Sequence, residues 1–130
     1  MITDVLRGFL IGRPAITALV SPDNIIKRPI DVETVNYAIL AFRETGNTEQ
    51  YLLNDEPGLN IHSITIVCVN KSPEQTLKIA KAVENDLIGF KGDINGIYCV
   101  GIQKVGYSDE YEPDTHAHVG VLSLQFFTRG

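Results

Sequence analysis

The chain has 130 residues and a mass of 14.3 kDa, which is enough for one domain and too short for two compact ones. Hydrophobic residues make up 44% and charged residues 21%, a balance that excludes a disordered chain. No apolar run approaches the ~20 residues of a membrane span, and the first residues are spaced like an amphipathic helix rather than a signal peptide. We therefore expect a single domain over residues 1–130 and no membrane partner.

Charge is unevenly distributed along the chain. The net charge of −5 argues against a protein that reads nucleic-acid sequence, because such proteins present a basic face. Residues 44–70 and 105–128 contain no Lys or Arg and together hold eight of the 16 acidic residues. These acidic segments are either two solvated loops or surfaces that bind a basic patch on another copy of the chain.

The N-terminal part predicts two short helices and a short strand. Residues 3–11 place their apolar side chains on one helical face, and Thr3 can cap that helix. Pro14 suits the first turn of a second helix. A turn at residues 21–24 then leads to a short strand at residues 25–26.

A predicted strand and a long acidic segment follow. Residues 37–44 (YAILAFRE) are apolar on both faces, which is typical of a central strand. Residues 46–60 are rich in Gly, Asn, Asp, Glu and Pro and predict a long loop. Its apolar residues Tyr51, Leu52 and Leu53 either fold back onto the protein's own core or bind another protein.

The clearest signals lie in the middle of the chain. Residues 61–69 (IHSITIVCV) are dense in β-branched residues and predict a strand. Ser72, Pro73 and Gln75 then form the pattern of a capping box, which predicts the start of a helix. Gly89 suits its end.

The last segments complete the fold prediction. A tight turn at residues 93–96 precedes a strand over residues 97–105. Residues 106–115 predict a second acidic loop, and residues 117–128 alternate as a long final strand. This order of elements predicts an α+β fold, with an antiparallel or mixed sheet of about four main strands and the helices on one face.

The sequence carries no recognisable catalytic motif. Cys68 and Cys99 lie inside apolar runs, so we expect reduced core residues, with a disulfide between adjacent strands as the alternative. His62 could pair with either cysteine, but no spacing indicates it. The carboxylates show no matched acid–base pair, and the glycines form no phosphate-binding loop. We therefore predict a protein that is not an enzyme and has no cofactor.

The nearest approach to a metal motif is His116 with His118. The two side chains share one face if the segment is a strand, and Glu112 or Asp114 would complete a site of two histidines and one carboxylate. The alternative is a pair of surface histidines at the start of a strand. Because no spacing fixes a third ligand, we expect no metal.

Read in order, these segments resemble the tail-completion (tail-terminator) family of long-tailed bacteriophages and prophages. The resemblance covers nearly the whole chain: the helical start MITDVLRGFLIGRPAITALV, Arg28-Pro29 before YAILAF, then ITIVCV, SPEQTLKIAKAVENDLIGFKG and IYCVGIQKV. Its most specific part is Tyr111-Glu112-Pro113-Asp114-Thr115 followed by VGVLSLQFF. The family often has Arg or Tyr where this chain has His116-Ala117-His118, so a charge contact made there would differ.

The resemblance implies a structural role in a virion. Family members form a hexameric ring at the head-proximal end of the tail tube, end tube polymerisation and provide the head–tail joining surface. The implied partners are other copies of the chain in a homohexamer, the tail tube protein and the head connector or head-closure protein. DNA would pass through the lumen without sequence-specific binding. The implied location is the tail of the virion, after synthesis in the host cytoplasm.

Three other functions remain as alternatives, the last of which is a small enzyme of unrecognised type. The first is a head-closure or connector adaptor of the same phage neck, which would differ in the partner that it binds. The second is a small metal- or ligand-binding protein that uses His116 and His118, for which metal analysis of the pure protein is the test.

We place the interaction sites of the ring in the two acidic segments. They combine carboxylates with the aromatic and aliphatic side chains that interfaces favour. The alternative is that these side chains cover the core of their own subunit. The candidate inter-subunit or tail-tube contacts are Glu49, Gln50, Tyr51, Leu52, Leu53, Tyr107, Asp109, Glu110, Tyr111, Glu112 and Asp114.

Overall fold

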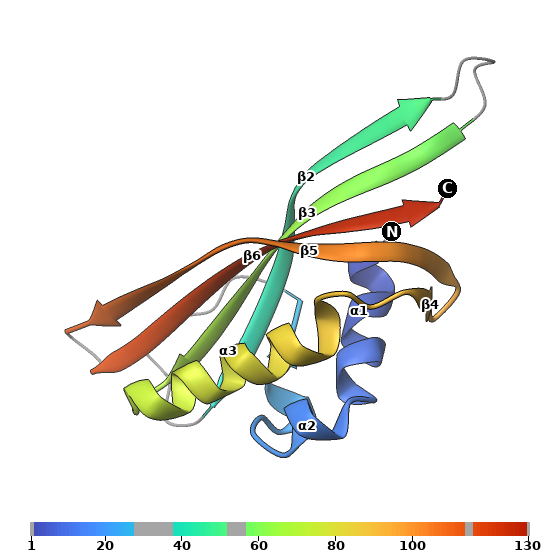
Figure 1. Ribbon diagram of the computed structural model, residues 1–130. Helices are drawn as coiled ribbons and strands as arrows, with labels where there is room; N and C mark the ends of the chain where they lie inside the picture. The colour runs from blue at the N-terminus through green and yellow to red at the C-terminus, as the bar shows by residue number, and fades with distance from the viewer. Residues whose placement is uncertain (1, 28–37, 52–56, 114–115, 130) are drawn as a thin grey trace.

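The computed structural model describes residues 2–27, 38–51, 57–113 and 116–129 and has the predicted α+β class (Figure 1). None of the described helices is long and apolar enough to cross a membrane. The elements in chain order are α1 (Ile2–Ile11), α2 (Pro14–Thr17), the 3-10 helix η1 (Pro22–Asn24), β1 (Ile25–Ile26), β2 (Ile39–Tyr51), β3 (Pro57–Asn70), α3 (Pro73–Leu87), β4 (Gly92–Ile94), β5 (Ile97–Glu112) and β6 (Ala117–Arg129).

The strands form one mixed sheet in the order β1-β2-β3-β6-β5-β4. β1 pairs with β2 in parallel, and every other neighbouring pair is antiparallel. The described sheet therefore has six strands, not four: β2, β3, β5 and β6 are long, whereas β1 and β4 have two and three residues. β1 coincides with the short strand predicted at residues 25–26, whereas β4 was missed: its three residues are too few to show a period, and they overlap the predicted turn at residues 93–96.

The strand predicted to be central, β2, lies second from one edge of the sheet. It is apolar on both faces because it contributes to two apolar clusters. Leu40 and Phe42 belong to the main core, whereas Ile39 packs with Val69 and Ala117 in a smaller cluster. Since side chains alternate along a strand, the smaller cluster lies on the opposite face of the sheet.

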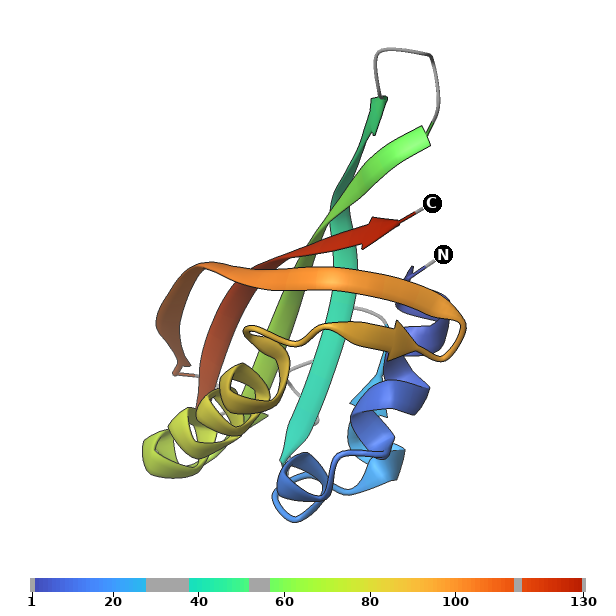
Figure 2. The ribbon, with the colours of Figure 1, turned by 45° about the vertical axis from the view of Figure 1, so that its right-hand side comes forward.

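The helices cover one face of the sheet (Figures 1 and 2). The main core lies between the two layers and includes Leu6 of α1, Val83 of α3, and Phe42, Ile66 and Phe126 of the sheet. Burial of each phenylalanine side chain, both almost inaccessible to solvent, stabilises the fold by roughly 1.5–3 kcal/mol. The alternation predicted for the last strand is confirmed, because its even-numbered residues from 120 to 128 are buried.

The local signals around α3 are confirmed. The hydroxyl of Ser72 accepts a hydrogen bond of 3.3 Å from the backbone N–H of Gln75, and Pro73 occupies the first turn. Beyond the last turn, Gly89 has a φ of 82°, a left-handed conformation that glycine adopts without strain. The capping residues therefore fix both ends of the longest helix.

The two acidic segments predicted as loops are largely strands, and this part of the sequence prediction is wrong. β2 runs to Tyr51, β3 begins at Pro57, and β5 runs to Glu112. Backbone pairing with neighbouring strands holds these polar residues in an extended conformation, which outweighs their weak intrinsic strand propensity. Gly46 and Gly106 each follow a register shift, where glycine accommodates a β-bulge.

Among the described residues, Glu49 of β2 and Asp109, Glu110 and Glu112 of β5 therefore lie toward the ends of two long hairpins. Figures 1 and 2 show that the β2–β3 end and the β5–β6 end point in opposite directions. We call them the β2–β3 tip (residues 46–51 and 57–60) and the β5–β6 tip (residues 107–113 and 116–118). The two acidic segments thus cannot form one continuous surface on a single subunit.

Candidate functional site

At the base of the β5–β6 tip, Tyr107 is held by its own subunit. Its hydroxyl donates a hydrogen bond of 2.7 Å to Asp109, and its ring packs against the main core. The ring also lies over Gly120 of β6, where an added Cβ would be 3.1 Å from two ring carbons. Burial, and then the bond to the Asp109 carboxylate, raise the pKa of the Tyr107 hydroxyl well above its usual range. Tyr107 and Asp109 therefore support the tip.

Farther out on the β5–β6 tip, the side chains are more exposed. Tyr111 is 50% exposed, its hydroxyl lies 2.8 Å from Nδ1 of His116, and its ring lies 4.8 Å from the ring of His118. Glu110 is exposed, and Glu112 is partly exposed. Asp114 lies outside the described residues.

The two histidines of the tip contact an aromatic ring instead of gathering carboxylates. His116 and His118 both lie against Tyr111. Among the described residues there is no group of three or more His, Cys, Asp or Glu side chains that could hold a metal ion. The alternative site of two histidines and one carboxylate is thus not assembled among the described residues, which do not include Asp114.

The β2–β3 tip extends beyond the helices (Figure 1). The backbone of Glu49, Gln50 and Tyr51 belongs to β2, where Glu49 pairs with Asn60 and Tyr51 with Pro57. Leu52 and Leu53 lie outside the described residues. The structure therefore places Glu49, Gln50 and Tyr51 at one end of the sheet, away from the β5–β6 tip.

Sequence reasoning missed a buried polar network between three strands. Nδ1 of His62 lies 3.0 Å from Oε1 of Glu44, and Nε2 lies 3.1 Å from the Thr128 hydroxyl. A carboxylate, an imidazole and a hydroxyl in this order form the geometry of a nucleophilic triad. Thr128 is only 2% exposed, however, so a substrate could not reach its hydroxyl. The network instead links β2, β3 and β6 at the base of the β2–β3 tip.

The two cysteines are core residues, as predicted. Cys68 and Cys99 are buried free thiols. Burial raises the pKa of Cys68 to about 12, and burial also raises the pKa of Cys99. Neither thiol is therefore ionised near neutral pH, and neither is suited to act as a nucleophile.

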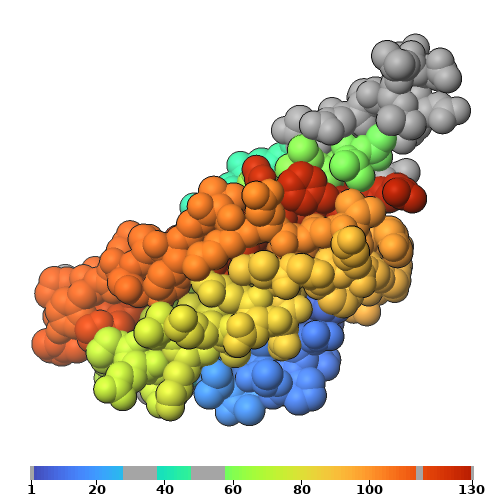
Figure 3. Space-filling model, in the orientation of Figure 1, coloured from blue at the N-terminus to red at the C-terminus, as the bar shows by residue number. Residues whose placement is uncertain are grey.

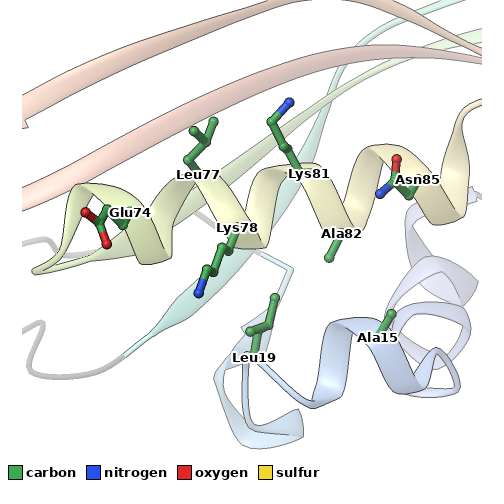
Figure 4. A pocket seen from close by; sticks show the side chains of 8 residues that line it. All are labelled: Ala15, Leu19, Glu74, Leu77, Lys78, Lys81, Ala82 and Asn85. Carbon is green, nitrogen blue, oxygen red and sulfur yellow. The ribbon is translucent and has the colours of Figure 1, made fainter.

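A second feature that the sequence did not reveal is an open groove of about 560 Å³ between α2 and α3 (Figure 4). Figure 3 shows that this side of the helix layer faces solvent. Within the described part of the chain, Lys78 and Lys81 are exposed and make no ion pair. The groove is thus apolar inside and basic along one rim. Its lining residues are Ala15, Leu19, Glu74, Leu77, Lys78, Lys81, Ala82 and Asn85.

No protein-family model matches the sequence, and no curated protein is similar to it. The fold, in contrast, matches a solved structure named "Virion of native gene transfer agent (GTA) particle". A chain of that particle aligns with a TM-score of 0.75 over 98% of this chain and 94% of its own length, at 15% sequence identity. The likeness therefore establishes a shared fold over almost the full length of both chains.

Proposed function

We propose that this protein is a structural component of a phage-like virion. The observation that carries this proposal is the fold, which extends over nearly the whole of both this chain and the chain of the gene transfer agent virion. The buried Thr128 hydroxyl and the un-ionised thiols support a role without catalysis. The hairpin tips and the groove offer surfaces for assembly instead.

Within the virion, we assign the protein to a hexameric ring that caps the head-proximal end of the tail tube. A ring requires each subunit to present two different surfaces to its two neighbours. The hairpin tips at opposite ends of the sheet would each contact a different part of the assembly, a neighbouring subunit or the tail tube (Figure 1). The ring would end tube polymerisation and present a joining surface to the head connector or head-closure protein.

The size and charge of the chain suit the passage of DNA through this ring. Six bodies of ~35 Å would surround an opening of comparable width, which is enough for duplex DNA. The net charge of −5 would repel the phosphates, so DNA would slide through the ring without sequence-specific binding. The cap would therefore not obstruct genome transfer.

The test is assembly with the tail tube protein of the same virus. Light scattering and negative-stain imaging should show rings of six, or a monomer that becomes a ring and caps one end of the tubes when tube protein is added. A stable monomer or dimer that ignores the tubes but binds the head connector would replace the cap with the neck adaptor.

A deletion tests the part played by the β2–β3 tip. Removal of Gln50–Leu53 should abolish ring or tail assembly while the circular dichroism spectrum of the monomer is retained. If the deletion protein caps tubes normally, this tip is not an assembly contact. If it unfolds, the deleted residues cover the core of their own subunit.

A further inference from the structure

The groove between α2 and α3 has an apolar wall and a basic rim (Figure 4). Leu77 on its wall is 43% exposed, and Leu19 opposite is partly exposed. In the described part of the chain, Lys78 and Lys81 line the groove, are exposed and form no ion pair, whereas Glu74 is the acidic residue of the lining. An exposed apolar surface that is rimmed by charge is typical of a site that binds protein.

A segment with the complementary composition is present in the same sequence. Residues 49–56 read EQYLLNDE, so three neighbouring apolar residues stand between Glu49 and the pair Asp55 and Glu56. These three acidic residues, with no basic one, give the segment a charge of −3. No Lys or Arg occurs between residues 44 and 70 to reduce it. The segment therefore matches the groove both in its apolar middle and in the sign of its charge.

This segment cannot reach the groove of its own subunit. β2 leads from Phe42 in the main core to Tyr51, nine residues of strand or about 30 Å. Tyr51 pairs with Pro57, so the chain leaves and re-enters the sheet at the same end, and the five residues 52–56 can extend only about 10 Å beyond it. Figure 1 shows that the β2–β3 tip extends away from α2 and α3. A groove that binds this segment must therefore belong to another molecule.

We propose that the groove between α2 and α3 binds residues 49–56 of a second copy of this chain. The apolar residues of the segment cover the apolar wall of the groove, and Asp55 and Glu56 face Lys78 and Lys81. The contact joins two different surfaces and so leads from one copy to the next. This inference rests on the proposed ring and assigns one of its subunit contacts.

Charge-reversal variants of the full chain test this contact by mutual rescue. Lys78→Glu with Lys81→Glu in one protein, and Asp55→Lys with Glu56→Lys in another, should each weaken self-association about tenfold or more, because like charges then face each other. In an equimolar mixture, reversed grooves can bind reversed segments and native grooves can bind native segments, so association should return. A folding defect in either variant could not be corrected by mixing.

The matched control is Lys71→Glu with Lys91→Glu. It changes the net charge by the same amount at two exposed residues outside the groove, so it should leave association unchanged. The measurement is the mass in solution by light scattering, for the chain alone and with tail tube protein added. It is repeated from about 0.05 to 0.5 M NaCl, where screening should weaken the wild-type contact.

The outcomes separate this contact from the proposed cap. Reversed variants that associate as well as the wild type, or a mixture that does not recover, would overturn the contact. If the wild type and both reversed variants cap tubes equally well, the contact is wrong and the cap stands. If mixing restores association but the assembled chain ignores the tubes, the contact stands and the cap is wrong. A wild-type chain that stays monomeric with and without tube protein would overturn both.

Discussion

The contact between Tyr107 and Gly120 allows a sharp test of how the β5–β6 hairpin is held. Gly120 pairs with Asp109, and the ring of Tyr107 reaches diagonally across from β5 to cover it. A Cβ added at Gly120 would lie 3.1 Å from two ring carbons and closer still to the hydroxyl. The backbone of Gly120 does not have a positive φ, so the effect of Gly120→Ala is steric.

We expect Gly120→Ala to destabilise the protein by about 1–2 kcal/mol. The ring must move, which disturbs the core contact and the 2.7 Å hydrogen bond to Asp109. Overpacking of this kind costs about 1–3 kcal/mol, whereas the reduced entropy of the unfolded chain returns about 0.4–1 kcal/mol. At this chain length each kcal/mol lowers the Tm by roughly 4 °C.

Urea and thermal unfolding followed by circular dichroism would measure this change. In the double-mutant cycle with Tyr107→Leu, the substitution at Gly120 should become neutral or slightly stabilising, because the obstructing ring is gone. Gly101→Ala is the matched control, since nothing lies within 4 Å of its added Cβ. The reasoning is refuted if Gly120→Ala is as stable as the wild type, or equally destabilising without the ring.

Three further perturbations have expected outcomes. His62→Ala should lower the unfolding free energy by about 2–4 kcal/mol, since it leaves the carboxylate of Glu44 buried and unpaired; a change within error of the wild type in urea unfolding would contradict this. Cys68 should resist iodoacetamide at neutral pH until the protein unfolds, as read by mass spectrometry. Because its pKa rises from 9.0 to about 12 on folding, its stabilising contribution is present below pH 9 and should decline as the pH rises toward 12, a decline that Cys68→Ala should remove. Ser72→Ala should lower the unfolding free energy by about 1 kcal/mol through loss of the helix cap, and Ser72→Asp should retain most of it.

The elements that the sequence predicts well are those fixed by neighbouring residues. The start of α3 depends on Ser72, Pro73 and Gln75, all within one turn, and β6 shows an uninterrupted alternation. The strand conformation of the outer parts of β2 and β5 could not be predicted from neighbouring residues. Their residues are polar and acidic, and they are extended only because β3 and β6 pair with them from other parts of the chain.

The candidate sites could not be predicted from neighbouring residues either. The network of Glu44, His62 and Thr128 joins residues 18 and 66 positions apart, and only the register of three strands brings them together. The groove likewise forms only because α2 and α3 pack side by side in the folded protein. The acidic segments, in contrast, were visible in the sequence as charge, although not their position at opposite ends of the sheet.

That position bears on how copies of the chain can join. A two-fold symmetric contact through the β5–β6 tip would bring carboxylates against carboxylates, which is unfavourable at low ionic strength. A contact between unlike surfaces avoids this repulsion, because Lys78 and Lys81 are exposed on the helix layer and the acidic tips project from the ends of the sheet. Contacts between two different surfaces continue from one copy to the next until the chain of copies closes into a ring or extends as a filament. Contacts between unlike surfaces are thus the kind that the proposed ring needs.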